Sequence, residues 1–235
     1  ALLTEGLAAD GVEFMAVQGY GFEDEPVHEA VLAAAAQGAD VIVAVFGEHA
    51  SATGENQSRM KLELGSSQLQ ALEILKAQDK PVVALLMNGR PLDLSRENDL
   101  AGAILECWYP GTMAAPALLD ILYGKYNPSG RLTMSFPRNI GQVPVYYAAK
   151  STGRPVGVKK GRFTSSYLDC PNTPLYPFGY GLSYTDFSYS PVTLSSSSMT
   201  ADGSIEASVV VTNTGAAAGK EVVEVYFNPP YTNGG

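Results

Sequence analysis

Two glutamates in one short segment could carry out acid/base chemistry. Glu48 and Glu55 both lie in FGEHASATGENQSR (residues 46–59), at the end of an apolar run, with His49 and Arg59 beside them. Paired carboxylates can serve as general acid and base when their surroundings separate their proton affinities. Arg59 can pair with one carboxylate and leave the other as the proton donor. The competing interpretations are solvated loop glutamates and an arginine that caps loop backbone.

Helical patterns alternate with short apolar runs through the first 147 residues. The expected units are helix 26–38 before strand 40–47, helix 66–80 before strand 81–89, and strand 101–111 before helix 112–124. Strands separated by such helices pair in parallel and place functional loops at their carboxyl ends. We therefore expect an α/β sandwich with a mostly parallel sheet and the two glutamates in the loop after its first strand. Ser66 is the expected N-cap of the second helix.

The rest of the chain changes character twice. Residues 148–185 carry scattered Gly, Pro, Lys and Tyr and end in PLYPFGYGLSY, which indicates a long loop packed on the α/β domain. Further on, SIEASVVVTNTG (204–215) and KEVVEVYF (220–227) are typical of two antiparallel strands joined by a Gly/Ala-rich turn. A complete immunoglobulin-like sandwich needs ~100 residues. We therefore predict three parts, an α/β domain over 1–147, this loop, and an incomplete β-sandwich over 186–235.

Composition argues against several classes of partner. The formal net charge of −9 and the sequence pI near 4.7 offer no basic surface to nucleic acid or to an anionic membrane. The two histidines, His28 and His49, and the distant Cys107 and Cys170 lack the spacing of metal ligands. We expect no metal, no cofactor and no disulfide. The segment FGEHASATGE also lacks the GxGxxG turn of a nucleotide-binding domain.

A series of long motifs runs through the chain. They are GEHASATGENQSR, MNGRPLDL, ECWYPGTMAAPALLDILYGKYNPSGRLTMSFPR, GQVPVYY and PLYPFGYGLSYTDF. In order and spacing they resemble the second domain of glycoside hydrolase family 3 β-glucosidases, especially the bacterial periplasmic type. VVVTNTG and KEVVEVYF look like the first strands of that family's fibronectin type III-like domain. The resemblance implies that a (β/α)₈ barrel, which this sequence does not contain, supplies an aspartate nucleophile.

The same resemblance gives the two glutamates different ranks. The family's acid/base glutamate often stands four residues before an arginine, and ENQSR reproduces that spacing from Glu55 to Arg59. Glu55 is therefore the preferred acid/base. In other members the glutamate follows the strand within a GE string, so Glu48 is the alternative acid/base or a supporting carboxylate. Arg59 and His49 are expected to support the loop or bind substrate, and residues 88–90 are interpreted as a packing turn.

By resemblance, the chain is the C-terminal part of a retaining exo-β-glucosidase that removes terminal β-linked glucose, or xylose, from oligosaccharides. Its partners would be the oligosaccharide or β-glucoside substrate and the barrel domain of the same enzyme, with no nucleic acid and no membrane. A periplasmic or secreted location is implied as well. The chain alone would be inactive, because it lacks the nucleophile. The alternative is a non-catalytic carbohydrate-binding or scaffolding fragment.

Overall fold

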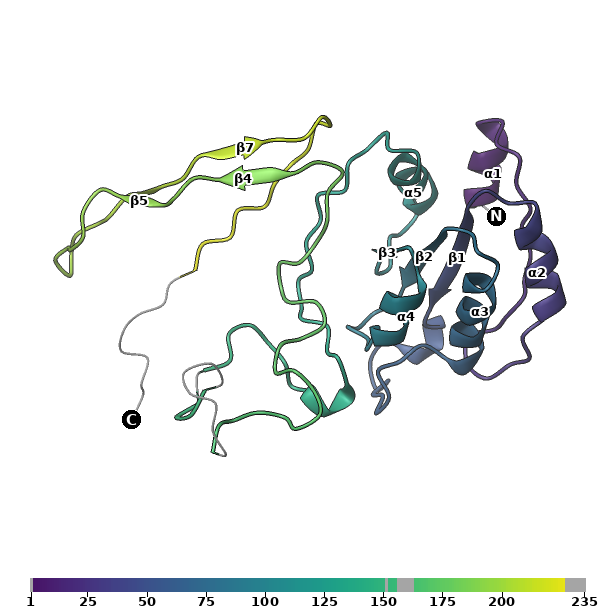
Figure 1. Ribbon diagram of the computed structural model, residues 1–235, viewed down its shortest axis with the longest axis horizontal. Coiled ribbons are helices and arrows are strands. Elements are labelled where there is room, and N and C mark those ends of the chain that lie inside the picture. The colour runs from purple at the N-terminus through teal and green to yellow at the C-terminus, as the bar shows by residue number, and fades with distance from the viewer. Residues whose placement is uncertain (1, 151, 156–162, 227–235) are drawn as a thin grey trace.

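The computed structural model describes residues 2–150, 152–155 and 163–226, and it contains a three-stranded parallel sheet (Figure 1). Its strands are β1 (Ile42–Gly47), β2 (Val82–Met87) and β3 (Ala103–Glu106), in the order β1-β2-β3. Gly47 lies beside Met87, and Leu86 lies beside Glu106. Because all three strands run the same way, the loops that follow them leave from one edge of the sheet. The expected parallel α/β arrangement is confirmed.

Five α-helices accompany this sheet within the described part of the chain. They are α1 (Leu2–Ala9), α2 (Glu29–Gln37), α3 (Ser66–Lys76), α4 (Ser95–Leu100) and α5 (Ala114–Leu122). Helices α2, α3 and α4 pack side by side, whereas α1 packs against α5 (Figure 1). Helix α3 buries Gln68, Leu72 and Leu75, which recur at the three- and four-residue spacing of one helix face. This face joins the core of the sheet.

Strand β1 is covered on one face only. Ala44 and Phe46 are buried with Leu72 of α3, but Val43 and Val45 remain 41% and 45% exposed. A continuous apolar run of this kind is typical of a strand buried on both faces. The structure instead gives the alternating exposure of a strand whose second face meets solvent, because the helical layer lies on the Phe46 side.

The start of α3 corrects the expected N-cap. The helix begins at Ser66, so the residue in the N-cap position is Gly65. The hydroxyl of Ser66 donates to the carbonyl of Glu23 at 3.3 Å, and that of Ser67 donates to the same carbonyl at 3.0 Å. The chain around residue 23 lies so close that a Cβ on Gly65 would stand 2.0 Å from the carbonyl oxygen of Phe22. Tertiary contact with this segment therefore takes the place of a side-chain cap.

Residues 131–136 and 175–180 lie side by side although they are distant in sequence. Phe136 forms an antiparallel bridge with Tyr176, Leu132 N–H donates to the carbonyl of Tyr180 at 2.8 Å, and Gly179 N–H donates to the carbonyl of Leu132 at 2.7 Å. Between these segments lies a single 3₁₀ turn, Ile140–Gln142, among the described residues. The boundaries at residues 147 and 185 remain predictions.

The last part forms two short antiparallel pairs, drawn in Figure 1 as one ribbon apart from the parallel sheet. Strand β4 (Phe187–Tyr189) pairs with β7 (Val211–Asn213), and β5 (Thr193–Leu194) pairs with β6 (Ala207–Ser208). The predicted hairpin between 204–215 and 220–227 is wrong: β7 pairs with β4, and residues 220–226 form no strand. Phe227 lies outside the described residues. Side-chain contacts hold this segment instead, since Glu221 pairs with Arg131 at 2.7 Å and accepts from Tyr189 at 2.8 Å.

Candidate acid/base loop

The loop after β1 begins with a backbone turn that only glycine can form. Gly47 has φ +147°, and a Cβ at this position would stand 1.8 Å from the carbonyl oxygen of Met87. Gln68 fixes the same residue, since its side chain accepts from Gly47 N–H at 2.7 Å and donates to the Gly47 carbonyl at 2.9 Å. Glu48 N–H then donates to Met87 at 3.0 Å. These bonds set the direction in which Glu48 leaves the strand.

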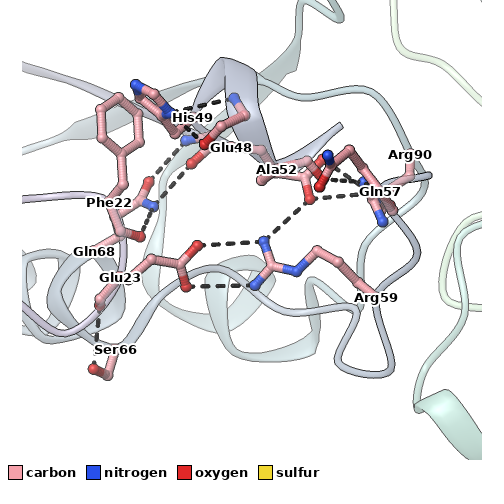
Figure 2. A network of polar contacts seen from close by, with 12 residues as sticks. Phe22, Glu23, Glu48, His49, Ala52, Gln57, Arg59, Ser66, Gln68 and Arg90 are labelled. Atoms are coloured by element: carbon pink, nitrogen blue, oxygen red, sulfur yellow. Dashed lines mark hydrogen bonds and ion pairs between the residues drawn. The ribbon is translucent and has the colours of Figure 1, made fainter. Parts of the chain in front are cut away.

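Glu48 is a buried anion held by two arginines (Figure 2). Its side chain is 2% exposed. Arg59 Nη1 lies 3.3 Å from its Oε1, and Arg90 Nε lies 3.1 Å from the same oxygen. Oε2 accepts from Arg90 Nε at 3.2 Å and from Gly89 N–H at 3.3 Å. Both carboxylate oxygens are therefore bound within the protein, which suits a structural anchor.

Both arginines also contact other groups. Arg90 Nη2 donates to the carbonyls of Ala52 and Gln57, the latter at 3.3 Å, so it holds both sides of the loop that contains Glu55. Arg59 pairs with Glu23 through two contacts of 3.4 Å. Figure 2 shows the guanidinium group of Arg59 facing the carboxylate of Glu23. Two cations and two anions make this cluster neutral overall.

Glu55 stands in a different environment. It lies in a β-turn closed by a hydrogen bond of 3.2 Å from Gln57 N–H to the carbonyl of Gly54. Asn56 occupies the third turn position with φ +63°, which asparagine tolerates better than most residues. Glu55 is exposed, and its carboxyl has no hydrogen bond or ion pair with any residue that the structure describes. This carboxyl is free to meet a substrate or another domain.

His49 organises the first turn of the loop. Its Nδ1 lies 2.8 Å from the hydroxyl of Ser51 and accepts from Ser51 N–H at 3.2 Å, which caps the 3₁₀ turn Ala50–Ala52. Its ring meets the edge of Phe22, with 5.3 Å between the ring centroids. His49 therefore shapes the loop while its imidazole remains exposed.

A mostly apolar groove of about 390 Å³ adjoins the cluster through Arg90. Tyr147 and Phe178, which stack with centroids 4.4 Å apart, contribute to its lining.

Over the described ranges, no group of three or more His, Cys, Asp or Glu side chains could hold a metal ion. None of the helices described combines the length and apolar character that a membrane crossing requires.

The structure therefore separates the residues that the sequence had grouped. It brings Glu48 and Arg59 into one ion pair, whereas Glu55 lies in the loop apart from that pair. Sequence reasoning missed the role of Arg90, which was interpreted as part of a packing turn, and it missed Glu23. A usable signal existed for Arg90, because it follows β2, and loops after adjacent parallel strands meet at one edge. Glu23 lies before the first strand and gave no such signal.

These features define an α/β domain that carries an exposed glutamate on an ion-paired loop at the carboxyl edge of its sheet. Residues 9–184 match the glycosyl hydrolase family 3 C-terminal domain, and the chain belongs to this family. The match extends through the segment PLYPFGYGLSY, so this part of the chain is included in the family's domain.

Curated relatives and solved structures agree with this placement. A periplasmic β-glucosidase of Salmonella typhimurium is 52% identical over 194 residues, which are 82% of this chain and 25% of the relative. A β-xylosidase of Formosa agariphila is 40% identical over 91% of this chain and 28% of its own length. The structure of a Listeria innocua β-glucosidase in complex with isofagomine superimposes with a TM-score of 0.81 at 38% identity, over 90% of this chain and 30% of that one. The chain thus spans roughly a quarter to a third of these proteins.

Proposed function

We propose that this chain is the part of a retaining β-glucosidase that supplies the general acid/base, and that Glu55 is this group. The observation that carries the assignment is the contrast between two carboxyl groups. The Glu48 side chain is 2% exposed and is bound by two guanidinium groups. Glu55 is exposed, and its carboxyl forms no hydrogen bond or ion pair with the described residues. A proton donor must reach the leaving-group oxygen, and only Glu55 has that freedom.

The reaction needs a second carboxylate from another domain. In the retaining mechanism a nucleophile forms a glycosyl-enzyme while the acid protonates the departing oxygen, and the resulting carboxylate then removes a proton from the attacking water. The two carboxyl groups stand about 5–5.5 Å apart. The sheets of the described residues are one three-stranded parallel sheet and two antiparallel pairs, and none of them is a barrel. We therefore assign the aspartate nucleophile to a barrel domain of the same enzyme and expect the chain alone to be inactive.

In this proposal Glu48 and Arg90 hold the acid/base loop in place. Glu48 joins the loop after β1 to the turn after β2, and Arg90 binds the carbonyls of Ala52 and Gln57 on either side of Glu55. A fixed loop places the proton donor correctly without further ordering during the reaction. Arg59 and His49 contribute by shaping the same loop, through Glu48 and Ser51 respectively.

The names of the relatives suggest the substrate and the location. We assign terminal β-linked glucose as the sugar, because the relative with 52% identity is a β-glucosidase, whereas the β-xylosidase is 40% identical. That β-glucosidase is periplasmic, and a periplasmic or secreted location is proposed for this protein also. Residues 1–147 are assigned to the α/β domain, residues 148–185 to a long loop packed on it, and residues 186–235 to a partial fibronectin type III-like domain.

A hybrid enzyme tests the acid/base assignment. This chain would replace the matching quarter of the Salmonella enzyme, and kcat/KM would be measured on aryl glucosides with good and poor leaving groups. Glu55→Gln should slow the poor leaving groups about 10²–10⁴-fold and hardly affect the good ones, because only the former require protonation. Glu48→Gln, the matched control, should affect both kinds of substrate equally. Leaving-group dependence in Glu48→Gln but not in Glu55→Gln would reverse the assignment.

A further inference from the structure

Two buried oxygen atoms at the carboxyl edge of the sheet have no hydrogen-bond partner. They are Oδ1 of Asn88 and Oε2 of Glu106, and no other buried side-chain nitrogen or oxygen in the described residues lacks one. Asn88 is 0% exposed. A buried polar atom left unpaired costs about 1–3 kcal/mol, so native proteins rarely contain one without a reason.

The two side chains lie on one face of neighbouring strands. Leu86 of β2 is in register with Glu106 of β3. Asn88 follows Leu86 by two residues, and both are buried whereas Met87 between them is only partly buried, so the alternation of the strand continues through Asn88. This places Asn88 and Glu106 on the same side of the sheet, where β2 and β3 end.

Each side chain uses its other polar atom on the loop that follows its own strand. Asn88 Nδ2 donates to the carbonyl of Arg90 at 2.6 Å, and Glu106 Oε1 accepts from Trp108 N–H at 2.9 Å. Oδ1 of Asn88 and Oε2 of Glu106 therefore remain without a hydrogen-bond partner. Two acceptor oxygens can form a hydrogen bond only if one of them carries a proton, and of the two groups only the carboxyl can take it up.

We propose that Glu106 is protonated and donates a hydrogen bond from Oε2 to Oδ1 of Asn88, which fixes the turn 88–90 that anchors Glu48. Glu106 is then a positioning residue for the acid/base loop. The catalytic role of the loop that Glu106 positions rests on the function proposed above, whereas the hydrogen bond between Glu106 and Asn88 does not. One proton satisfies both orphaned oxygens at once.

The turn 88–90 connects this pair to the loop. Gly89 N–H and Arg90 Nε both donate to Glu48. Gly89 also has no space for a larger residue, since an added Cβ would stand 2.5 Å from Oγ1 of Thr53 and 2.9 Å from the ring of Tyr109. The loops that follow β1, β2 and β3 thus meet at Gly89. A bond that holds Asn88 acts on all three loops.

The electrostatic surroundings of Glu106 are consistent with a proton. Burial raises its pKa to about 7, and the only opposing effect is the hydrogen bond from Trp108. The neighbouring Cys107 stays neutral, because burial, and then the charge of Glu106, raise its pKa to about 11. On the adjacent helix α4, burial likewise raises the pKa of Glu97 to about 7, but the charges acting on it are Asp93, Arg96 and Glu63. The proposed bond is therefore present below about pH 7 and lost above it.

Nuclear magnetic resonance on this chain tests the pair directly. The side-chain amide of Asn88 and the carboxyl carbon of Glu106 should shift together between pH 5 and 9, with a common midpoint near 7. In Glu106→Gln the Asn88 signal should keep its low-pH position throughout, because the glutamine amide donates the same bond. Glu97→Gln is the matched control, and it should leave the Asn88 transition unchanged.

Two results would overturn the pair: an Asn88 signal that does not titrate in the unaltered chain, or a Glu106 carbon that titrates near the ordinary value of 4.5. The positioning role has its own readout. Above pH 7 the Gly89 amide should exchange faster than its intrinsic pH dependence predicts, and Glu106→Gln should remove this excess. If the Gly89 amide shows no such excess exchange above pH 7, Glu106 does not position the turn. None of these measurements requires enzyme activity, so they can refute the pairing of Glu106 with Asn88 without bearing on the assignment of Glu55 as acid/base.

Discussion

Arg90 Nε lies 3.1 Å from Oε1 of Glu48, and this contact joins the loop after β1 to the turn after β2. Arg59 approaches the same oxygen at 3.3 Å from the far end of the loop. One buried carboxylate therefore links three points of the chain that are separated by up to 42 positions in sequence. The roles that we propose for Glu48 and Glu55 rest on this geometry, since a carboxylate that holds two arginines is not free to move toward a substrate.

Glu48→Gln should destabilise the chain strongly. Removing one partner of a buried ion pair costs about 3–5 kcal/mol, and we expect the lower end because the two arginine side chains retain 17% and 22% exposure. Urea denaturation of the isolated chain measures this loss. The control is Glu55→Gln, which should leave the free energy of unfolding unchanged within error. Equal losses in the two variants would contradict the structural role of Glu48.

Arg90→Lys should loosen the loop around Glu55 more than Arg59→Lys does. Both arginines contact Glu48, but only Arg90 also binds the carbonyls of Ala52 and Gln57. A lysine has a single ammonium group and cannot hold the carboxylate and both carbonyls in the same geometry. Hydrogen exchange of residues 50–58 should therefore rise in Arg90→Lys and change little in Arg59→Lys. The reverse order would show that Arg59 is the main support.

Gly47→Ala and Gly54→Ala separate steric exclusion from backbone strain. Both glycines have positive φ, +147° and +125°, but an added Cβ meets the carbonyl oxygen of Met87 at 1.8 Å in the first case and nothing within 4 Å in the second. Gly54→Ala should cost about 1–3 kcal/mol from strain alone. Gly47→Ala should cost more than about 4 kcal/mol or abolish cooperative unfolding. Similar urea midpoints for the two variants would argue against the close approach of β1 and β2.

The parallel sheet could be predicted because its signal is local. The runs around β1 and β2 are short and apolar, and each follows an amphipathic helix, so neither requires knowledge of distant contacts. The expected strand 220–227 is wrong over the described residues 220–226, which pair with no other described strand. Long-range contacts such as that of Glu221 with Arg131 hold this segment instead. The prediction that Ser66 is the N-cap of α3 is also wrong because of a long-range contact, since the segment around Glu23 lies against the start of this helix.

For the candidate site, the sequence predicted the loop that holds Glu48 and Glu55 but not the contacts within that loop. The spacing of Glu55 and Arg59 suggested the acid/base, yet that spacing does not show that Arg59 binds Glu48 and Glu23. The contribution of Arg90 depends on strand order, which a sequence pattern implies only once the sheet has been assembled. The pairing of Asn88 with Glu106 likewise depends on register and burial.

Glu97→Gln should flatten part of the pH dependence of stability. Burial on α4 raises the pKa of Glu97 from 4.5 to about 7, so the folded chain binds this proton more tightly than the unfolded chain does. Its stabilising contribution is full below pH 4.5 and is lost as the pH rises through about 7. At about 1.4 kcal/mol per pKa unit, the loss is about 3 kcal/mol.

Urea midpoints between pH 4 and 8 measure this effect. The control is Asp99→Asn, an exposed carboxyl on the same helix, which should keep the slope of the unaltered chain. If Glu97→Gln also keeps that slope, Glu97 is ionised in the folded chain, and burial does not dominate its titration.

Azide should rescue Glu55→Gln in the hybrid enzyme. Without the acid/base, an activated aryl glucoside still forms the glycosyl-enzyme, but water then attacks slowly because no base removes its proton. Azide is already an anion and needs no base, so it should restore turnover and yield a β-glucosyl azide with retained configuration. Glu48→Gln is the matched control and should gain nothing, since its defect lies in the position of the loop. Rescue of Glu48→Gln with a β-glucosyl azide product, and none of Glu55→Gln, would assign the acid/base to Glu48.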